Sequence, residues 1–236
     1  MSPRCRLVPL GAAALALSLA ACSSTVDYER YTGRPTQVDY QLADPVLVIR
    51  GPEGEELGVC TEYGPVFLGR HCRSGEVELV AWFGDGPSIE ACVVEPLGGG
   101  IYTATTEIRL PQVPIRFTAP EPGTEVYVRG RRGETRWQEE LKVVAHPKLR
   151  GLLLECPDSG PLSTDAGIGA GVFVPGPEGK DHMVLLGLVC GRAEVQEGGR
   201  THRYLVAVGA DDLWRLVAWR RDWTPKPRWV YREDVL

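Results

Sequence analysis

The seven cysteines of this 236-residue chain include no CxxC pair, which argues against a zinc site. The chain also lacks a basic excess, since its formal net charge is −5 at pH 7, so we expect no nucleic-acid partner. Its 28 glycines and 19 prolines fall below the level typical of disordered chains, and no internal repeat is visible. With 43% hydrophobic residues it can bury a core, so we expect a folded domain without metal or cofactor.

The one long apolar run, residues 7–19, is too short to span a bilayer comfortably. It follows two arginines and precedes small residues, the pattern of an export signal over residues 1–21. The sequence LAAC that ends at Cys22 resembles a bacterial lipobox. That resemblance implies a lipid on Cys22 that anchors the chain in the cell envelope, and Ser23 in place of aspartate favours the outer membrane. An uncleaved membrane anchor is the alternative.

The chain beyond the signal divides into three parts. Residues 22–44 are polar and aperiodic and are predicted to tether the lipid to a domain over 45–223. Residues 224–236 form a tail with proline, tryptophan and arginine that packs on the domain or touches a partner. Within the domain, strand-like runs alternate with glycine- and proline-containing turns. They lie at 46–49, 66–68, 77–83, 91–94, 101–110, 115–117, 126–128, 141–144, 152–154, 172–174, 183–189 and 204–208.

About a dozen short strands with no helix between them predict an all-β fold, either a sandwich or paired barrels. One helix is predicted near the end of the chain, over 212–221. Asp211 is expected to cap it, and its apolar residues recur at helical spacing.

Five cysteines follow Cys22, and an exported chain permits disulfides. Cys60 and Cys72 bracket a turn and a short apolar run, and a bridge between them would contribute about 3 kcal/mol of stability. We predict this bridge. We also predict a Cys156–Cys190 pair, which leaves Cys92 over. A structural disulfide with a surface histidine beside it would account for the segment.

The same segment, CTEYGPVFLGRHC, also resembles the catalytic-histidine segment of trypsin-like (chymotrypsin-fold) serine proteases. Further segments resemble that family in the same order along the chain, at 106–110, 113–117, 121–130, 169–173 and 185–189. The resemblance covers residues 45–222. It implies a trypsin-like double β-barrel that ends in a short helix.

Within the resemblance His71 is the general base, and a carboxylate must orient it. Glu107 stands where the family carries its aspartate, although its extra methylene would tilt the imidazole unless the backbone compensates. Asp85 is a second carboxylate, in a turn between two glycines.

Two registers compete for the nucleophile. In the first, Ser159 lies in CPDSGPL, a shortened form of the family's nucleophile motif. Pro157 then occupies an oxyanion-hole position without an N–H, which costs roughly 10²–10³ in rate. In the second register Ile168 takes the nucleophile position at the head of IGAGVF. We favour the second, because the hairpin that follows then has a natural length.

Either register lacks a group that catalysis needs. The leading hypothesis is therefore a lipid-anchored, trypsin-like pseudoprotease that binds an envelope protein or peptide. The first alternative is an active serine endopeptidase that uses His71 and Ser159. The second is an unrelated β-sandwich lipoprotein of the envelope.

Overall fold

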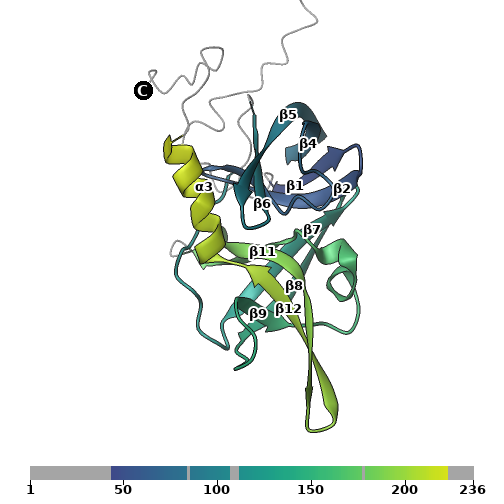
Figure 1. The fold of residues 1–236 in the computed structure, drawn as a ribbon, viewed down its shortest axis with the longest axis vertical. Coiled ribbons are helices and arrows are strands. Elements are labelled where there is room, and N and C mark those ends of the chain that lie inside the picture. Colours follow the sequence, from purple (N-terminus) through teal and green to yellow (C-terminus); the bar gives the residue numbers. More distant parts are fainter. Residues whose placement is uncertain (1–43, 84–85, 107–111, 177–178, 223–236) are drawn as a thin grey trace, which may run out of the picture. The chain divides into compact units, whose positions relative to one another are not determined.

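Two successive groups of six strands make up the domain (Figure 1). The structure, a computed structural model, describes residues 44–83, 86–106, 112–176 and 179–222, all within one unit, Thr36–Leu236. In the first group the order β1-β2-β3-β6-β5-β4 closes into a barrel. Its strands are β1 (Asp44–Gly51), β2 (Gly54–Thr61), β3 (Gly64–Phe67), β4 (Glu76–Phe83), β5 (Gly86–Gly98) and β6 (Ile101–Thr105).

The second group repeats this order as β7-β8-β9-β12-β11-β10 and also closes. Its strands are β7 (Glu125–Arg132), β8 (Thr135–Val144), β9 (Leu152–Glu155), β10 (Gly171–Gly176), β11 (Gly179–Glu197) and β12 (Arg200–Val208). Two short 3-10 turns, η1 (Pro161–Ser163) and η2 (Asp165–Gly167), precede β10, and helix α3 (Ala210–Asp222) follows β12. The domain is thus a trypsin-like double β-barrel with a short C-terminal helix, as the resemblance implies. The two closed barrels exclude the β-sandwich alternative.

Strand β1 shows why some of the predicted strands are continuous apolar runs without polar residues between them. Leu47 and Ile49 belong to the core inside the first barrel, whereas Val46 and Val48 belong to a cluster that includes both barrels. Successive side chains of a strand point to opposite faces, so a strand covered on both sides shows no polar alternation. The strand predicted over 46–49 is confirmed on this basis.

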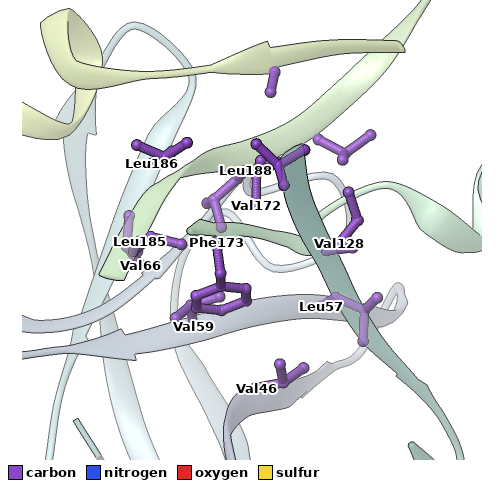
Figure 2. Close-up of a cluster of buried hydrophobic side chains, with 14 of the residues drawn as sticks. Val46, Leu57, Val59, Val66, Val128, Val172, Phe173, Leu185, Leu186 and Leu188 are labelled. Atoms are coloured by element: carbon purple, nitrogen blue, oxygen red, sulfur yellow. The ribbon is translucent and has the colours of Figure 1, made fainter. Parts of the chain in front are cut away.

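The shared cluster joins buried residues of both barrels (Figure 2). It contains Val46, Leu57, Val59 and Val66 from the first barrel and Val128, Val172, Phe173, Leu185 and Leu188 from the second. Phe173 is fully buried, and its ring lies so close to Gly171 that a Cβ there would come within 2.5 Å of it. Burial of a side chain of this size contributes about 2–3 kcal/mol, and only glycine at 171 leaves room for it.

The chain that connects the barrels is hydrogen-bonded to both. Val113 donates its N–H to Cys60 O (3.1 Å) and accepts the N–H of Glu62 (3.1 Å), both near the end of β2. One residue later, the carbonyl of Pro114 accepts the N–H of Leu185 in β11 (2.9 Å). The connection is therefore fixed to a strand of each barrel.

Helix α3 confirms the predicted C-terminal helix but begins slightly earlier. The carbonyl of Gly209 accepts the N–H groups of Asp212 (3.1 Å) and Leu213 (3.0 Å), so Asp211 lies inside the helix and is not its cap. Leu213 and Leu216 are fully buried against the barrels. Among the described residues, no helix has both the length and the apolar character needed to cross a bilayer.

The other departures from the predicted strands have local reasons. Strand β2, with the sequence GEELGVCT, is not predicted because charge and glycine interrupt its apolar pattern. The predicted strand at 115–117 is an isolated bridge between Ile115 and Leu185. β11 extends well beyond the predicted run 183–189, because β12 pairs with it as far as Glu197.

Candidate functional site

A buried carboxylate holds the turn that contains His71. The turn joins β3 to β4, and Glu56 of β2, only 7% exposed, points its side chain at the turn's backbone. Glu56 Oε1 accepts the N–H groups of His71 (3.2 Å) and Cys72 (2.9 Å), and Oε2 accepts that of Arg70 (3.0 Å). The His71 ring lies beside Gly54, where a Cβ would come within 3.4 Å of Cγ. The Glu56 carboxylate thus accepts three backbone N–H groups, and these hydrogen bonds fix the turn against β2.

The predicted Cys60–Cys72 disulfide is wrong, because none of the five described cysteines forms one. The Sγ of Cys72 lies 3.7 Å from Ile49 O and 3.8 Å from Gly54 O. Gly54 and Cys60 are six residues apart along β2, roughly 20 Å at the rise of a strand, well beyond the roughly 7 Å that a bridge tolerates between Cα atoms. Hydrogen bonds to Glu56 hold the turn in place of the bridge.

The predicted Cys156–Cys190 pair is also absent. Cys190 is exposed, and its Sγ lies 3.3 Å from Val206 O on β12. Val206 pairs with Leu153 of β9, so Cys156 lies one strand further across the barrel and three residues further along the chain. The chain path therefore keeps the two thiols apart.

Burial makes the thiols of Cys60 and Cys72 unreactive. Desolvation, with a smaller contribution from the Glu56 carboxylate, raises the pKa of Cys72 to about 12. Burial also raises the pKa of Cys60. Both remain protonated at neutral pH, and only a thiolate acts as a nucleophile or metal ligand. The described part of the chain contains no group of three His, Cys, Asp or Glu side chains that could hold a metal ion.

Several predicted sites lie outside the described residues. These are the lipid-accepting Cys22, the tail 224–236, and both carboxylates considered as partners of the imidazole, Glu107 and Asp85. The carboxylate that the structure does place at the His71 turn is Glu56, and its hydrogen bonds go to the backbone.

Ser159 lies in the turn between β9 and η1, where it is exposed. The next residue, Gly160, has φ +87°, and a Cβ there would come within 2.7 Å of Glu139 Oε1 on β8. This turn therefore lies against β8 of the second barrel. Within the described residues, no hydrogen bond or ion pair joins Ser159 to the His71 turn.

Ile168 begins a segment that is fixed between the two barrels. Gly169 has φ +90°, and a Cβ there would come within 2.5 Å of Leu57 O on β2. The same glycine donates its N–H to Val189 O of β11 (2.7 Å), and the N–H of Val189 returns to Ala170 O (2.9 Å). The segment thus contacts β2 at the residue that follows Glu56. Adjacent residues of β2 hold the His71 turn and the segment after Ile168.

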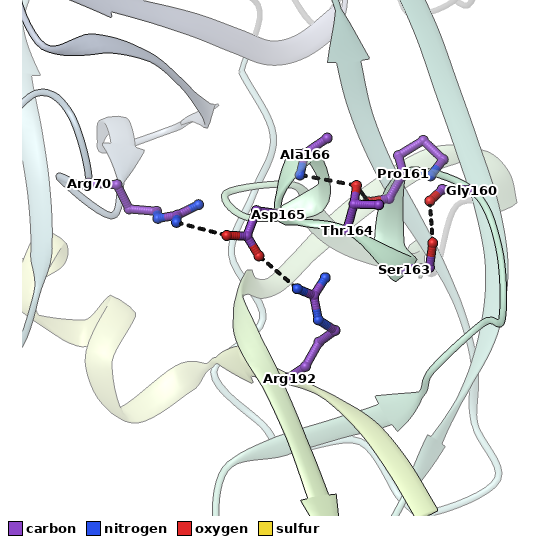
Figure 3. A network of polar contacts seen from close by, with 8 residues as sticks. All are labelled: Arg70, Gly160, Pro161, Ser163, Thr164, Asp165, Ala166 and Arg192. Carbon is purple, nitrogen blue, oxygen red and sulfur yellow. Dashed lines mark hydrogen bonds and ion pairs between the residues drawn. The ribbon is translucent and has the colours of Figure 1, made fainter.

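An ion-pair network connects these two parts of the site (Figure 3). Asp165, in η2, forms ion pairs with two arginines. Arg192 of β11 lies 2.7 Å from Oδ1, and Arg70 of the first barrel lies 3.5 Å from Oδ2. The loop that presents Asp165 is ordered by Thr164, whose Oγ1 accepts the N–H of Ala166 (3.3 Å). Because Arg70 directly precedes His71, the network lies beside that turn.

Neither a protein-family model nor a curated protein matches the sequence. Solved structures of proteases resemble it at low identity. The inactive form of the Rv3671c protease, from M. tuberculosis, is 16% identical with a TM-score of 0.49, over 74% of this chain and 88% of that one. The MamO protease domain from Magnetospirillum magneticum is 14% identical with a TM-score of 0.47, over 74% and 94%. A human pathogenic astrovirus serine protease is 15% identical with a TM-score of 0.46, over 71% and 91%.

Sequence reasoning missed four residues that build this site: Glu56, Arg70, Asp165 and Arg192. Their contacts cross sequence separations of 14 to 95 residues, so no local pattern marks them. The only available signal is the position of Arg70 next to His71, and the segment that contains Glu56 was not predicted as a strand.

Proposed function

We propose that this chain is a lipid-anchored envelope protein whose trypsin-like domain binds a protein or peptide without hydrolysing it. The observation that carries the proposal is the contact of the Ile168–Gly169 segment with β2, next to the turn that contains His71. Serine-protease chemistry requires a hydroxyl beside the histidine, and isoleucine has none. Ile168 is the residue that we assign to the nucleophile position.

The backbone around Ile168 supports the same conclusion. An oxyanion hole uses the N–H of the nucleophile and that of the residue two positions before it. Here the N–H of Ile168 donates to Asp165 O (3.1 Å), and that of Ala166 donates to Thr164 Oγ1 (3.3 Å). Both donors are occupied within the 3-10 turns, so an incoming carbonyl oxygen would have to displace these bonds.

The alternative nucleophile, Ser159, has less support. It is exposed in a turn that lies against Glu139 of β8, and Pro157 offers no N–H to an oxyanion. An active endopeptidase that uses Ser159 and His71 would need this turn to approach β2. The binding function needs only the surface that the His71 turn and the Asp165 loop already form.

A fluorophosphonate probe tests the absence of catalysis. The chain from Ser23 onward is expected to react at least about 100-fold more slowly than an active serine protease, because a serine at the base and a free oxyanion hole are both lacking. It is also expected to leave unfolded casein intact. In-gel fluorescence of the labelled protein and mass spectrometry of the casein measure the two results.

The variants His71→Ala and Ser159→Ala decide what any labelling means. Labelling that Ser159→Ala abolishes and His71→Ala reduces would replace the proposal with an active endopeptidase. Labelling that persists in Ser159→Ala would indicate a stray nucleophile, for which the exposed thiol of Cys190 is the first candidate. Ser163→Ala is the matched control, because Ser163 is a nearby serine whose hydroxyl donates a hydrogen bond to Gly160 O (2.8 Å).

The envelope location rests on the lipobox resemblance at Cys22. Cys22→Ala is expected to leave an unprocessed precursor that takes up no labelled palmitate, whereas the natural chain becomes labelled and shorter. Metabolic labelling followed by gel electrophoresis makes the comparison, with Cys5→Ala as the control that should behave like the natural chain. Palmitate uptake by the Cys22→Ala chain, or none by the natural one, contradicts the anchor.

A further inference from the structure

Two arginines from different barrels share one carboxylate at the proposed binding site. Arg192 Nη2 lies 2.7 Å from Asp165 Oδ1, and Arg70 Nη2 lies 3.5 Å from Oδ2 (Figure 3). All three side chains reach solvent, with 31%, 36% and 65% of Arg192, Arg70 and Asp165 exposed. The network is therefore accessible to a ligand.

The network carries more positive charge and more donors than Asp165 can satisfy. Two guanidinium groups share the Asp165 carboxylate, while the other carboxylate beside Arg70, Glu56, is bonded to the backbone N–H groups of residues 70–72. A guanidinium has five N–H donors, and among the described residues each of these two makes only its contact with Asp165. The Arg70 contact is also long for a charge-assisted hydrogen bond, which typically measures about 2.7–2.9 Å. Both arginines therefore retain unused donors.

The location ties this charge to the proposed binding surface. Arg70 adjoins His71, and the carbonyl of Asp165 binds the N–H of Ile168 (3.1 Å). Arg192 follows Val189 by three residues on β11, and Val189 is hydrogen-bonded to the segment after Ile168. A peptide that contacts this surface would meet both guanidinium groups.

We propose that Arg70 and Arg192 bind a carboxylate of an acidic peptide, and that Asp165 is the internal anion with which this carboxylate competes. The inference rests on the proposed function. Guanidinium groups bind carboxylates with two parallel hydrogen bonds, which gives both strength and directionality. Exposed ion pairs contribute little to stability, so the exchange of Asp165 for a ligand carboxylate costs little. The chain's net charge of −5 acts weakly here, because salt screens charges beyond roughly 8 Å.

A fluorescein-labelled Gly/Ser peptide with two adjacent glutamates is the probe, and fluorescence anisotropy measures its binding to the mature full chain. A matched peptide with glutamines, and versions of both with an amidated C-terminus, distinguish a side-chain carboxylate from a terminal one. The peptides with a carboxylate, whether from the glutamates or from a free C-terminus, are expected to include at least one that binds about tenfold more tightly than the amidated glutamine peptide, which has none. The same affinity for all four peptides, or no measurable binding of any, overturns the inference.

Variants separate a binding role from a structural one. Asp165→Asn removes the competing charge and is expected to tighten binding about three- to tenfold, whereas Arg192→Gln and Arg70→Gln weaken it by a similar factor. Arg203→Gln is the control: this arginine forms an exposed pair with Glu194 on the β11–β12 hairpin (3.1 Å) and should leave binding unchanged. If Asp165 only links the barrels, Asp165→Asn leaves affinity unchanged or lowers it, and the inference is wrong.

Mass spectrometry of the peptides after incubation keeps the two proposals distinguishable. Intact peptides without a carboxylate preference overturn only the present inference. Cleaved peptides overturn the proposed function. In that case the KM of the Asp165→Asn variant tests the inference: a lower KM for the glutamate peptide supports it, and an unchanged KM contradicts it.

Discussion

Glu56→Ala is expected to lower the free energy of unfolding by about 3 kcal/mol, because it leaves three backbone N–H groups of a partly buried turn without their acceptor. The lost acceptor is charged, and a hydrogen bond to a charged group contributes about 1.5–3 kcal/mol, with less than full additivity among neighbours. Urea denaturation followed by tryptophan fluorescence should show a lower midpoint at an unchanged m value.

Two variants serve as controls for Glu56→Ala. Glu56→Gln keeps one accepting oxygen of the two that bind the turn, so its loss should be intermediate. Glu55→Ala removes the neighbouring carboxylate, which is 56% exposed and paired with Arg50 at the surface, and should cost less than about 1 kcal/mol. Equal losses for Glu56→Ala and Glu55→Ala would show that the carboxylate does not hold the turn.

Arg131→Leu is expected to cost about 3–5 kcal/mol, since it leaves the charge of Asp44 buried and unpaired. The two side chains are 7% and 4% exposed and meet at 2.7 Å, Arg131 from β7 and Asp44 from the start of β1. The guanidinium also lies 4.0 Å from the ring centroid of Trp82, and Asp44 Oδ1 accepts the N–H of Val46 (3.1 Å). Thermal and urea denaturation of the variant measure the loss.

The double variant Asp44→Asn/Arg131→Leu tests the cause. The double variant buries no unpaired charge, so it should be more stable than Arg131→Leu alone. If Arg131→Leu were destabilising only through lost packing, the added Asp44→Asn change would not restore stability. Arg203→Leu breaks an exposed pair and should change stability by less than about 1 kcal/mol. If the double variant is no more stable than Arg131→Leu, the buried charge is not the source of the effect.

The sequence predicted the fold where burial was strong and local. Runs such as 46–49 are apolar because both faces of the strand are covered, and the helix over 212–221 follows from the spacing of Leu213 and Leu216. Strand β2 was missed because its partners β1 and β3, and not its own pattern, make it a strand.

The site was harder to predict because its contacts are distant in sequence. The resemblance pointed to His71 and Ile168, but no sequence pattern shows that Glu56 accepts the N–H of His71 or that Leu57 lies against Gly169, the residue after Ile168. The disulfide prediction failed for a related reason. The spacing of Cys60 and Cys72 gives the length of the loop but not its path: the turn lies against the start of β2, and Cys60 lies near the strand's other end.

The connection between the barrels bears on how the proposed partner would dock. Val113 is hydrogen-bonded to the β2 end and Pro114 to Leu185, so the described part of the connection, from residue 112 onward, is held to both barrels at these two adjacent residues. A hinge needs a few residues that can absorb large φ/ψ changes, and residues 113–114 are held from both sides. Recognition should therefore proceed by rigid docking on a preformed surface, with little ordering entropy lost by this chain. Any induced fit would then belong to the partner.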